Sequence, residues 1–381
     1  MRYRVTCLTP LLVGDGRKLA PIDYMVWKDQ VNVLDQRRIF RLLAKGPRLE
    51  GYLGQLKRAD KLDFASWGGF AQNFADRRIP FENAASSNYW NRAMGESLHI
   101  PTFAAGPSGP YLPGAAIKGA LRTGMMFANW RNGMLRDVAA RFQAERPPRR
   151  PAEAVEEQAL GAAGNTRMRL VSAGDSAPVP VSQFRVYLLR VSTLVPRGAG
   201  LALGWKQSPR GAVDGARPEE STPWFAEMAV PGSVFEGDWQ EHTFLTQPEV
   251  RRAVRWPEGF QCGRIFDAAN QYAARLLGIQ KQYAAAAGLD LLGRQVEELE
   301  ARVEAARASG GCVMPLGWGG GLLTKSAWLD TADTEYRQIL QHLSLYNRAL
   351  SSNLPFPKTR RIVFLNNKPA SLPGWVLLEV A

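Results

Sequence analysis

The order of its expected elements constrains the fold of this sequence more than any other feature. Residues 2–10 predict a short strand, because Tyr3, Val5 and Cys7 alternate with polar residues. Residues 24–34 predict a hairpin with a polar turn at 28–30, and Asp35 can cap a helix over residues 36–44. Strand–helix–strand units recur with hairpins between them, without a regular βαβαβ run. This order favours an α+β fold of the split βαβ type, with an antiparallel sheet covered by helices on one face.

The later part of the chain repeats this mixture with longer elements. Residues 181–195 predict a long strand, and residues 224–239 predict its antiparallel neighbour, turned at Pro231-Gly232. Helices are expected from 263 to about 308. The segment RPPRRP at 146–151 is rich in breakers and opens a linker or insertion that runs to about residue 180. We therefore expect an N-terminal domain over residues 1–145 and a C-terminal domain over residues 181–381.

The charge of the chain indicates a polyanionic partner. The sequence holds 48 Lys and Arg against 35 Asp and Glu, a net charge of +13. Residues 111–150 carry eight basic and two acidic residues, and residues 336–378 carry six basic residues and no acid. Two separated basic zones suit a long anion such as nucleic acid better than a single small phosphate. A basic surface for a protein partner is the alternative.

Cysteine usage and hydropathy indicate a cytoplasmic protein that does not cross a membrane. Cys7, Cys262 and Cys312 lie far apart and form no CxxC pair, which argues against a disulfide framework and a structural zinc site. No apolar run approaches the roughly 20 residues that a membrane span needs. The first ten residues also lack the apolar core of a secretory signal.

The segment YLPGAAIKGALRTGMM, residues 111–126, resembles a phosphate loop without being one. A P-loop places Lys and then Ser or Thr directly after its second glycine, whereas Lys118 here precedes Gly119. The segment predicts a strand that ends at Pro113-Gly114 and a helix that starts by about Ala115, with Lys118 and Arg122 together on one face. This helix start is expected either to hold phosphates of an RNA backbone or to be a capped helix with a basic surface.

A second glycine-rich segment, LGWGGGLLTKSAW at residues 316–328, is more telling. Its glycines are Gly317, Gly319, Gly320 and Gly321, and such a cluster is costly in chain entropy. Glycines let a backbone approach a ligand closely, Trp318 can stack on a base, and Lys325 adds a cation. A tight turn with a core Trp is the alternative.

Two further segments are related to the glycine-rich segment at residues 316–328, one by its charge and one by its sequence. The residues FPKTRR add Lys358, Arg360 and Arg361 just before a predicted strand. The stretch PLLVGDG at residues 10–16 is a weak echo of PLGWGGG at residues 315–321.

The sequence gives little support for catalysis or for a cofactor. His99, His242 and His342 are scattered and lie in no metal-ligand motif, and no HExxH or nucleophile motif is present. Asp15 and Asp23 suit a turn and a cap better than a metal site. GWGGG is not followed by the last glycine of GxGxxG. We therefore expect no nucleotide cofactor, no metal and no enzymatic activity.

The motifs together resemble the RAMP superfamily of CRISPR-associated proteins. YLPGAAIKGALRTG, PLGWGGGLLTKS, FPKTRRI and the opening TPLLVGDGRKLAPIDYMVW carry the resemblance, which spans the chain. They are most similar to the fifth Csm subunit of type III-A effector complexes, which caps the backbone filament near the three-prime end of the guide. The motif positions that match the family are Gly114, Lys118, Gly119, Arg122, Gly317, Trp318, Gly319, Gly320, Gly321, Lys325, Lys358, Thr359 and Arg360.

The resemblance implies tandem ferredoxin-like (RRM-like) domains with helical insertions. It implies CRISPR RNA as ligand, and the repeated backbone subunit and the small helical subunit of a Csm complex as partners. It also implies a part in guide maturation through host nucleases, without an active site in this chain. A RAMP endoribonuclease that cuts repeat RNA and a purely scaffolding subunit remain the alternatives.

Overall fold

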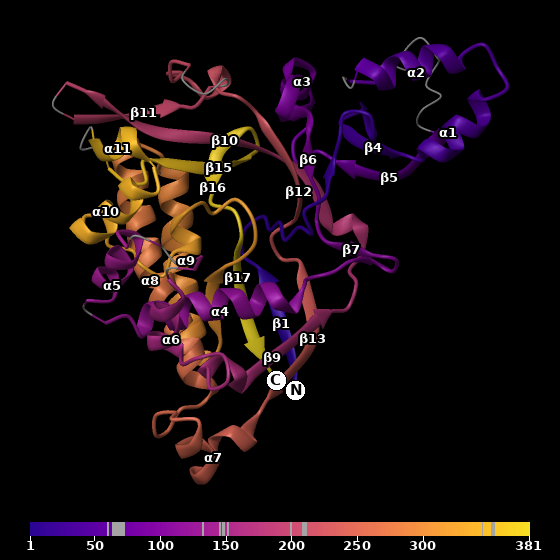
Figure 1. Cartoon of the computed structure of the whole chain (residues 1–381). Helices are drawn as coiled ribbons and strands as arrows, with labels where there is room; N and C mark the ends of the chain where they lie inside the picture. The colour runs from indigo at the N-terminus through magenta and orange to yellow at the C-terminus, as the bar shows by residue number, and fades with distance from the viewer. Residues whose placement is uncertain are drawn as a thin grey trace.

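The computed structural model describes most of the chain. The described residues are 1–58, 61–62, 73–131, 133–144, 146, 149–150, 152–198, 200–207, 212–344, 346–351 and 355–381. Residues 145, 147, 148 and 151, where the first domain boundary is expected, lie outside them. The two termini lie side by side (Figure 1), and the Arg2 amide donates to the Ala381 carbonyl at 2.8 Å.

The first large sheet joins the two ends of the chain. All its neighbouring strands are antiparallel, in the order β14 (Cys312–Pro315), β17 (Trp375–Val380), β1 (Arg2–Cys7), β13 (Val234–Glu241) and β9 (Val171–Ser176). Tyr3, Val5 and Cys7 are buried on one face of β1, as their alternation predicts. In the sequence, α4 (Gly114–Ala128) lies between β1 and β9, and α8 (Cys262–Ala287) lies between β13 and β17. Together with these helices the sheet forms a ferredoxin-like β-α-β-β-α-β unit.

The second large sheet is built from strands that the chain inserts into the first unit. Its order is β11 (Gly200–Trp205), β10 (Phe184–Arg197), β15 (Thr359–Leu365) and β16 (Lys368–Ser371), with β12 (Trp224–Ala229) also paired to β10. The predicted pairing of residues 181–195 with 224–239 therefore holds only for β12. The turn at Pro231-Gly232 instead carries the chain into β13 of the first sheet.

The two large sheets are thus interleaved along the sequence. β9 lies within the expected linker at 146–180, and β1 pairs with both β13 and β17, so the first sheet crosses both predicted domain boundaries. Sheet pairing joins residues that are hundreds of positions apart, and local breaker patterns carry no information about it.

The longer helices lie to one side of the two sheets (Figure 1). α8 and α9 form a hairpin whose apolar residues, among them Leu276 and Leu292, pack in a core shared with the second sheet. Ile117, Leu121 and Met125 of α4 pack with β1 in the core of the first sheet. The helices on this side are α4 (Gly114–Ala128), α5 (Met134–Phe142), α6 (Glu153–Leu160), α8 (Cys262–Ala287), α9 (Asp290–Ser309), α10 (Thr334–His342) and α11 (Asn347–Ser351), and α7 (Pro248–Ala253) projects from the lower end.

A separate arm extends from the opposite side of the molecule (Figure 1). We define the arm as the sheet β3 (Tyr24–Trp27), β4 (Gln30–Leu34) and β5 (Ala75–Pro80) with helices α1 (Gln36–Leu43) and α2 (Leu49–Arg58). The predicted hairpin and helix are confirmed, and the Asp35 carboxylate caps α1 by accepting from the Arg38 amide at 2.9 Å. The remaining short elements are β2 (Lys18–Leu19) paired with β6 (Ile100–Pro101), β7 (Ala105–Gly106) paired with β8 (Gly109–Pro110), and α3 (Ser86–Arg92).

Candidate nucleic-acid interface

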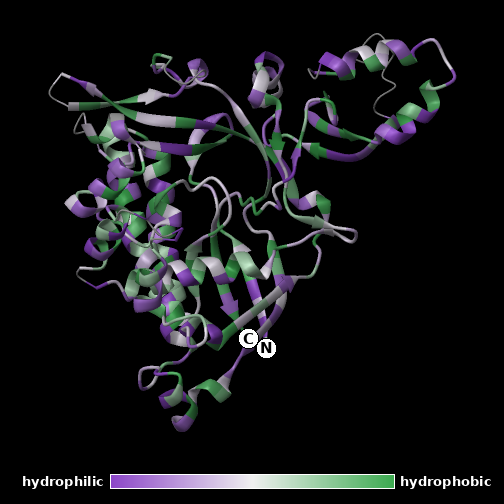
Figure 2. Ribbon diagram, viewed as in Figure 1, coloured by the Kyte–Doolittle hydropathy of each residue, from purple (hydrophilic) through white to green (hydrophobic). Residues whose placement is uncertain are grey.

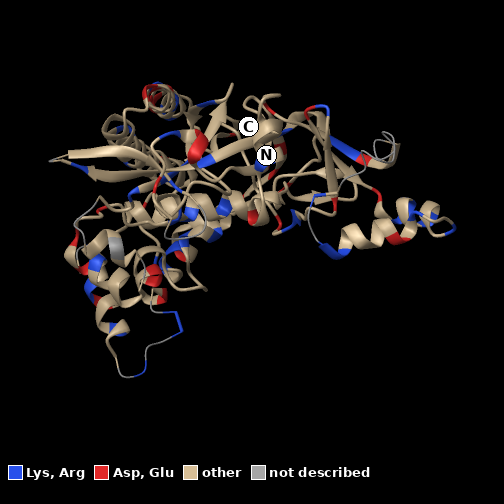
Figure 3. Cartoon of the chain, turned by 90° about the horizontal axis from the view of Figure 1, so that it is seen from above, with Lys and Arg blue, Asp and Glu red and all other residues tan. Residues whose placement is uncertain are grey.

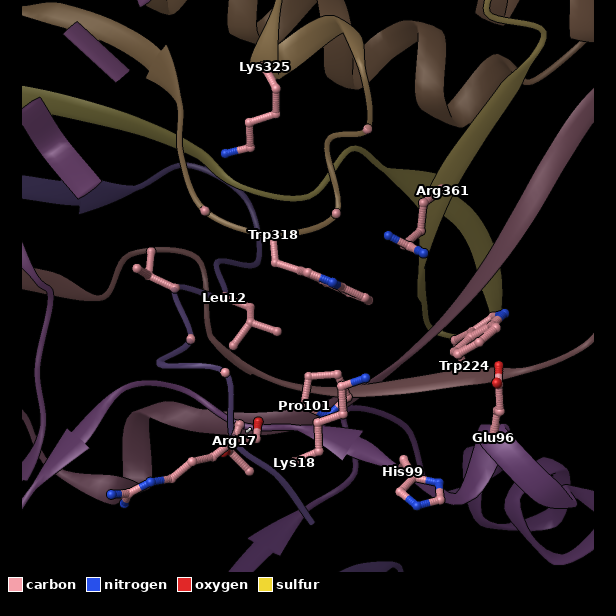
Figure 4. A pocket seen from close by; sticks show the side chains of 17 residues that line it. Leu12, Arg17, Lys18, Glu96, His99, Pro101, Trp224, Trp318, Lys325 and Arg361 are labelled. Carbon is pink, nitrogen blue, oxygen red and sulfur yellow. Dashed lines mark hydrogen bonds between the residues drawn. The ribbon is translucent and has the colours of Figure 1, made fainter. Parts of the chain in front are cut away.

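A cavity of about 860 Å³ lies where two glycine-rich segments meet. One wall is the segment 12–18, which leaves β1 of the first sheet, and another is residues 317–325, which follow β14 of the same sheet. We call the latter the glycine loop and the hollow the central cavity (Figure 4). The two segments are those in which the sequence shows a weak internal echo, and the fold places them against one another.

Backbone contacts hold the glycine loop against residues 12–18. The Trp318 amide donates to the Leu12 carbonyl at 2.7 Å. Gly317 has a φ of +74°, and a Cβ at this position would overlap the Leu12 carbonyl. Glycine is therefore required here for close packing of the two segments. Gly319 and Gly321 also line the cavity, whereas Gly320 packs against Thr324.

The cavity combines an aromatic surface with cations. The Arg361 guanidinium lies 4.2 Å from the centroid of the Trp318 ring, a cation–π contact (Figure 4). Arg361 comes from β15, so the loop and the second sheet meet at this pair. Within the described residues the buried Nε of Arg361 has no hydrogen-bond partner, and burial lowers the pKa of this guanidinium. A buried N–H group without a partner carries a desolvation cost, which a hydrogen-bond acceptor at this position would offset.

Further cations stand around the cavity. Lys325 is exposed at the rim, and desolvation by the surrounding protein lowers the pKa of its ammonium. Lys18 and Arg17 are exposed on the wall opposite the glycine loop (Figure 4), and Arg17 forms an ion pair with Asp15 at 3.4 Å. A strand of nucleic acid presents both elements that this lining can bind, planar bases and anionic phosphates.

Several lining residues were not expected from the sequence. Trp224, Glu96 and His99 line the cavity beside Arg17 and Lys18. The sequence similarity between PLLVGDG and PLGWGGG is the feature that could have predicted the first wall, because it relates the two glycine-rich segments that line the cavity. Trp224 and His99 carry no such signal, because β12 and the stretch before β6 reach the cavity only through tertiary packing.

The start of α4 is placed differently from the prediction. The Gly114 amide donates to the Asp175 carboxylate at 2.9 Å, so the protein itself supplies the anion expected there from RNA. Gly114 is buried, and a Cβ at this position would overlap the Ala173 carbonyl of β9. Its glycine is therefore explained by packing of α4 on the sheet.

The cations of this helix are also partly engaged. Arg122 pairs with Glu156 of α6, with Nε donating to Oε1 at 2.7 Å. Lys118 is half-buried, and desolvation lowers the pKa of its ammonium; Gly119 is exposed. None of these α4 residues is among the described residues that line the central cavity.

Arg360 corrects the interpretation of FPKTRR as a uniformly RNA-facing segment. Its side chain is buried, with Nε donating to Gln280 Oε1 at 2.6 Å and Nη1 donating to the Pro357 carbonyl at 2.7 Å. Burial lowers the pKa of Arg360 to about 10. Alternation along β15 points Arg360 into the core and Arg361 toward the cavity. Lys358 precedes β15 and is half-buried.

The structure describes no metal centre or membrane span. Among the described residues, no group of three or more His, Cys, Asp or Glu side chains is placed to hold a metal ion. Asp15 and Asp23 instead accept backbone hydrogen bonds from Arg17 and Ala20, the turn and capping roles that we predict for them. Of the helices described, none is both long enough and apolar enough to cross a bilayer.

Comparison with known families decides the relationship of this chain. The family model of the RAMP superfamily matches residues 4–265. The chain belongs to the RAMP superfamily. The resemblance of the chain to that superfamily is thereby confirmed. No curated protein sequence matches the chain.

Two solved structures share the fold over their full length. One is a chain of the cryo-EM structure of a Csm–crRNA–target RNA ternary complex of a type III-A CRISPR-Cas system, with a TM-score of 0.66 and 20% identity over 100% of both chains. The other is the crystal structure of T. onnurineus Csm5, with a TM-score of 0.61 and 18% identity over 98% of this chain and 99% of that one. The α+β fold of a RAMP protein is thereby confirmed.

Proposed function

We propose that this RAMP protein is a non-catalytic, CRISPR RNA-binding subunit of a type III-A (Csm) effector complex. It caps the backbone filament near the three-prime end of the guide and assists guide maturation in antiviral defence. The central cavity carries the proposal, because it brings Trp318, Arg361 and Lys325 together on a backbone that glycine allows to approach a ligand. Membership of the RAMP superfamily and the full-length likeness to Csm5 support it.

The lining gives each part of a ribonucleotide a partner. A base stacks on the Trp318 ring, and its phosphates lie between Lys325, Lys18 and the cavity-lining guanidinium of Arg361. Stacking and phosphate contacts are insensitive to sequence, which suits a subunit that must accept guides of any sequence. The net charge of +13 adds a long-range attraction for the RNA.

The partners of this function are the guide RNA and the other Csm subunits. The repeated backbone subunit and the small helical subunit are the proposed neighbours in the cytoplasmic complex, and host nucleases are the proposed source of the trimming activity. The likeness to a chain within a Csm–crRNA–target RNA complex supports this assembly.

Binding of guide-length RNA to the full chain at several salt concentrations tests the proposal. The variant Lys18→Ala/Trp318→Ala/Lys325→Ala is expected to weaken binding about a hundredfold and to lower the slope of log affinity against log salt by about 1.4, for two phosphate contacts with a single strand. The matched control Arg294→Ala/Arg302→Ala removes two exposed cations of α9, which lies outside the cavity lining. Equal affinities of the wild type and the triple variant would exclude the cavity as the binding site.

Cleavage of repeat RNA is the second candidate function, because His99 and Glu96 line the same cavity. Purified protein is incubated with labelled repeat RNA in EDTA, with His99→Ala as control. We expect no site-specific product. A reproducible product that disappears in His99→Ala would instead identify an endoribonuclease. A purely scaffolding role predicts that guide RNA cannot be crosslinked to Trp318 or Lys325.

A further inference from the structure

The helical tip of the arm is strongly basic. Within residues 36–58 the sequence has seven Lys and Arg and a single acid, Glu50. All seven cations are exposed, and Figure 3 shows them recurring along the arm on the right of the view. They are Arg37, Arg38, Arg41, Lys45, Arg48, Lys57 and Arg58. The tip lies outside both basic zones of the sequence, residues 111–150 and 336–378.

α1 sorts its residues onto two faces. Ile39 and Leu43 are buried in the small core of the arm, and Figure 2 shows hydrophobic and hydrophilic residues mixed in both α1 and α2. Arg37, Phe40 and Arg41 follow the spacing i, i+3, i+4 and share the opposite, exposed face. The Phe40 side chain is 48% exposed. Among the described residues, neither Arg37 nor Arg41 has an ion-pair partner.

Phe40 stands among like charges on this face of α1. Because Phe40 is half-exposed, it forgoes about half of the roughly 1.5–3 kcal/mol that full burial of such a side chain contributes. Cations on both sides of it repel one another, and no carboxylate of α1 relieves that repulsion because this helix contains no Asp or Glu. An aromatic ring flanked by cations is the combination that holds a base and its neighbouring phosphates in single-stranded nucleic acid.

The arm is fixed to the body of the protein. Arg77 of β5 donates to Glu227 Oε2 of β12 at 2.7 Å, and the Phe103 amide donates to the same oxygen. The Glu227 side chain is 1% exposed, and the Glu82 amide just after β5 donates to the Val186 carbonyl of β10 at 2.9 Å. These contacts anchor the arm to the second sheet, so its basic face keeps a defined orientation relative to the central cavity.

We propose that the exposed face of α1 is a second RNA-binding surface, in which Phe40 stacks on an unpaired base while Arg37, Arg41 and Lys45 contact the phosphates beside it. The charge favours RNA over a protein partner, because seven exposed cations stand against a single acid in residues 36–58, and such a surplus attracts a polyanionic backbone. The inference extends the proposed RNA binding but rests on separate residues. Its occupant is a single-stranded segment of the guide RNA.

Equilibrium binding of the full chain to two RNAs tests this surface. One RNA is a guide-length single strand, and the other is a guide–target duplex with a single-stranded target overhang. Arg37→Ala/Arg41→Ala is expected to weaken binding by about tenfold to thirtyfold at 0.1 M salt, with a salt slope lower by about 1.4. Phe40→Ala is expected to weaken it by about fivefold to a hundredfold with an unchanged slope, because stacking releases no counterion. Arg294→Ala/Arg302→Ala on α9 is the matched control.

The outcomes separate the sources and the alternatives. A defect with the guide single strand supports the inference, and a defect confined to the overhang duplex overturns it in favour of the target strand. Unchanged affinity for both RNAs overturns the inference, including the case in which the variants lose assembly with other subunits, which identifies a protein surface. The cavity variant Lys18→Ala/Trp318→Ala/Lys325→Ala is measured in parallel. A defect there without one in the arm overturns this inference alone, whereas a defect in neither overturns the proposed function as well.

Discussion

Two segments of this chain combine glycines with nearby cations, but the groups that surround them in the structure differ. At the start of α4, the Gly114 amide is bonded to Asp175, and Arg122 is paired with Glu156. At the glycine loop, Arg361 stacks on Trp318 and keeps an unpartnered Nε, and Lys325 stands at the rim of an open cavity. The first segment has its anions within the protein, and the second has room for one from outside.

These two segments show what a glycine beside a cation can and cannot indicate. Glycine next to a cation indicates close backbone approach, but it does not say whether another part of the chain or a ligand makes that approach. For α4 the approaching group is β9, whose Ala173 carbonyl fills the space that a Cβ at Gly114 would need. For the glycine loop, residue 317 approaches Leu12, and this contact builds one wall of the cavity.

The adjacent residues Arg360 and Arg361 give the largest expected contrast. Arg360→Ala should lower the free energy of unfolding by about 3 kcal/mol, because it leaves Gln280 and two backbone carbonyls without their buried donor. Arg361→Ala should instead weaken RNA binding by about fivefold to tenfold and change stability less. Urea unfolding and RNA titration of both variants check this. Equal loss of stability in the two variants would contradict the division between a core arginine and a ligand-facing one.

The two glycines of α4 sharpen the comparison next. Gly114→Ala should destabilise the fold by about 1–3 kcal/mol, since the new methyl group overlaps the backbone of β9. Gly119→Ala is the matched control: position 119 is exposed, has open space around it, and should gain about 0.5–1 kcal/mol in helix propensity. Thermal and urea unfolding measure both. If Gly114→Ala proved harmless, packing would not explain that glycine.

The ion pair on α4 gives the smallest expected effect. Arg122→Ala should change RNA affinity less than twofold, because Glu156 already neutralises this arginine, and an exposed pair of this kind contributes about 0–1 kcal/mol to stability. Glu156→Ala leaves Arg122 without its partner and is expected to strengthen RNA binding slightly at low salt. RNA titrations of both variants at two salt concentrations check this. A large loss in Arg122→Ala would place the RNA on α4 after all and remove the contrast with the glycine loop.

Much of the local structure follows from the sequence alone. Asp35 caps α1, the hairpin turns at Lys28 and Asp29, and residues 263–308 form helices, because caps, turns and apolar periodicity act over a few residues. The superfamily is likewise predicted from the sequence, and the family model that matches residues 4–265 confirms it. The sequence does not identify three of the cavity-lining residues, because their positions around the cavity depend on how distant segments pack. These are Arg17, Lys18 and Trp224.

The sequence thus predicted most helices and strands, the basic net charge, and the loop that most resembles a ligand-binding motif. Only the tertiary structure decided which glycine serves packing and which lines a cavity, and which arginine of an adjacent pair is buried. Helix propensity and capping depend on residues close in sequence. Which group becomes the partner of an N–H group or a cation depends instead on how distant strands pair in the sheets. In this chain, β1 pairs with β17, more than 360 residues later, and no pattern of neighbouring residues predicts this pairing.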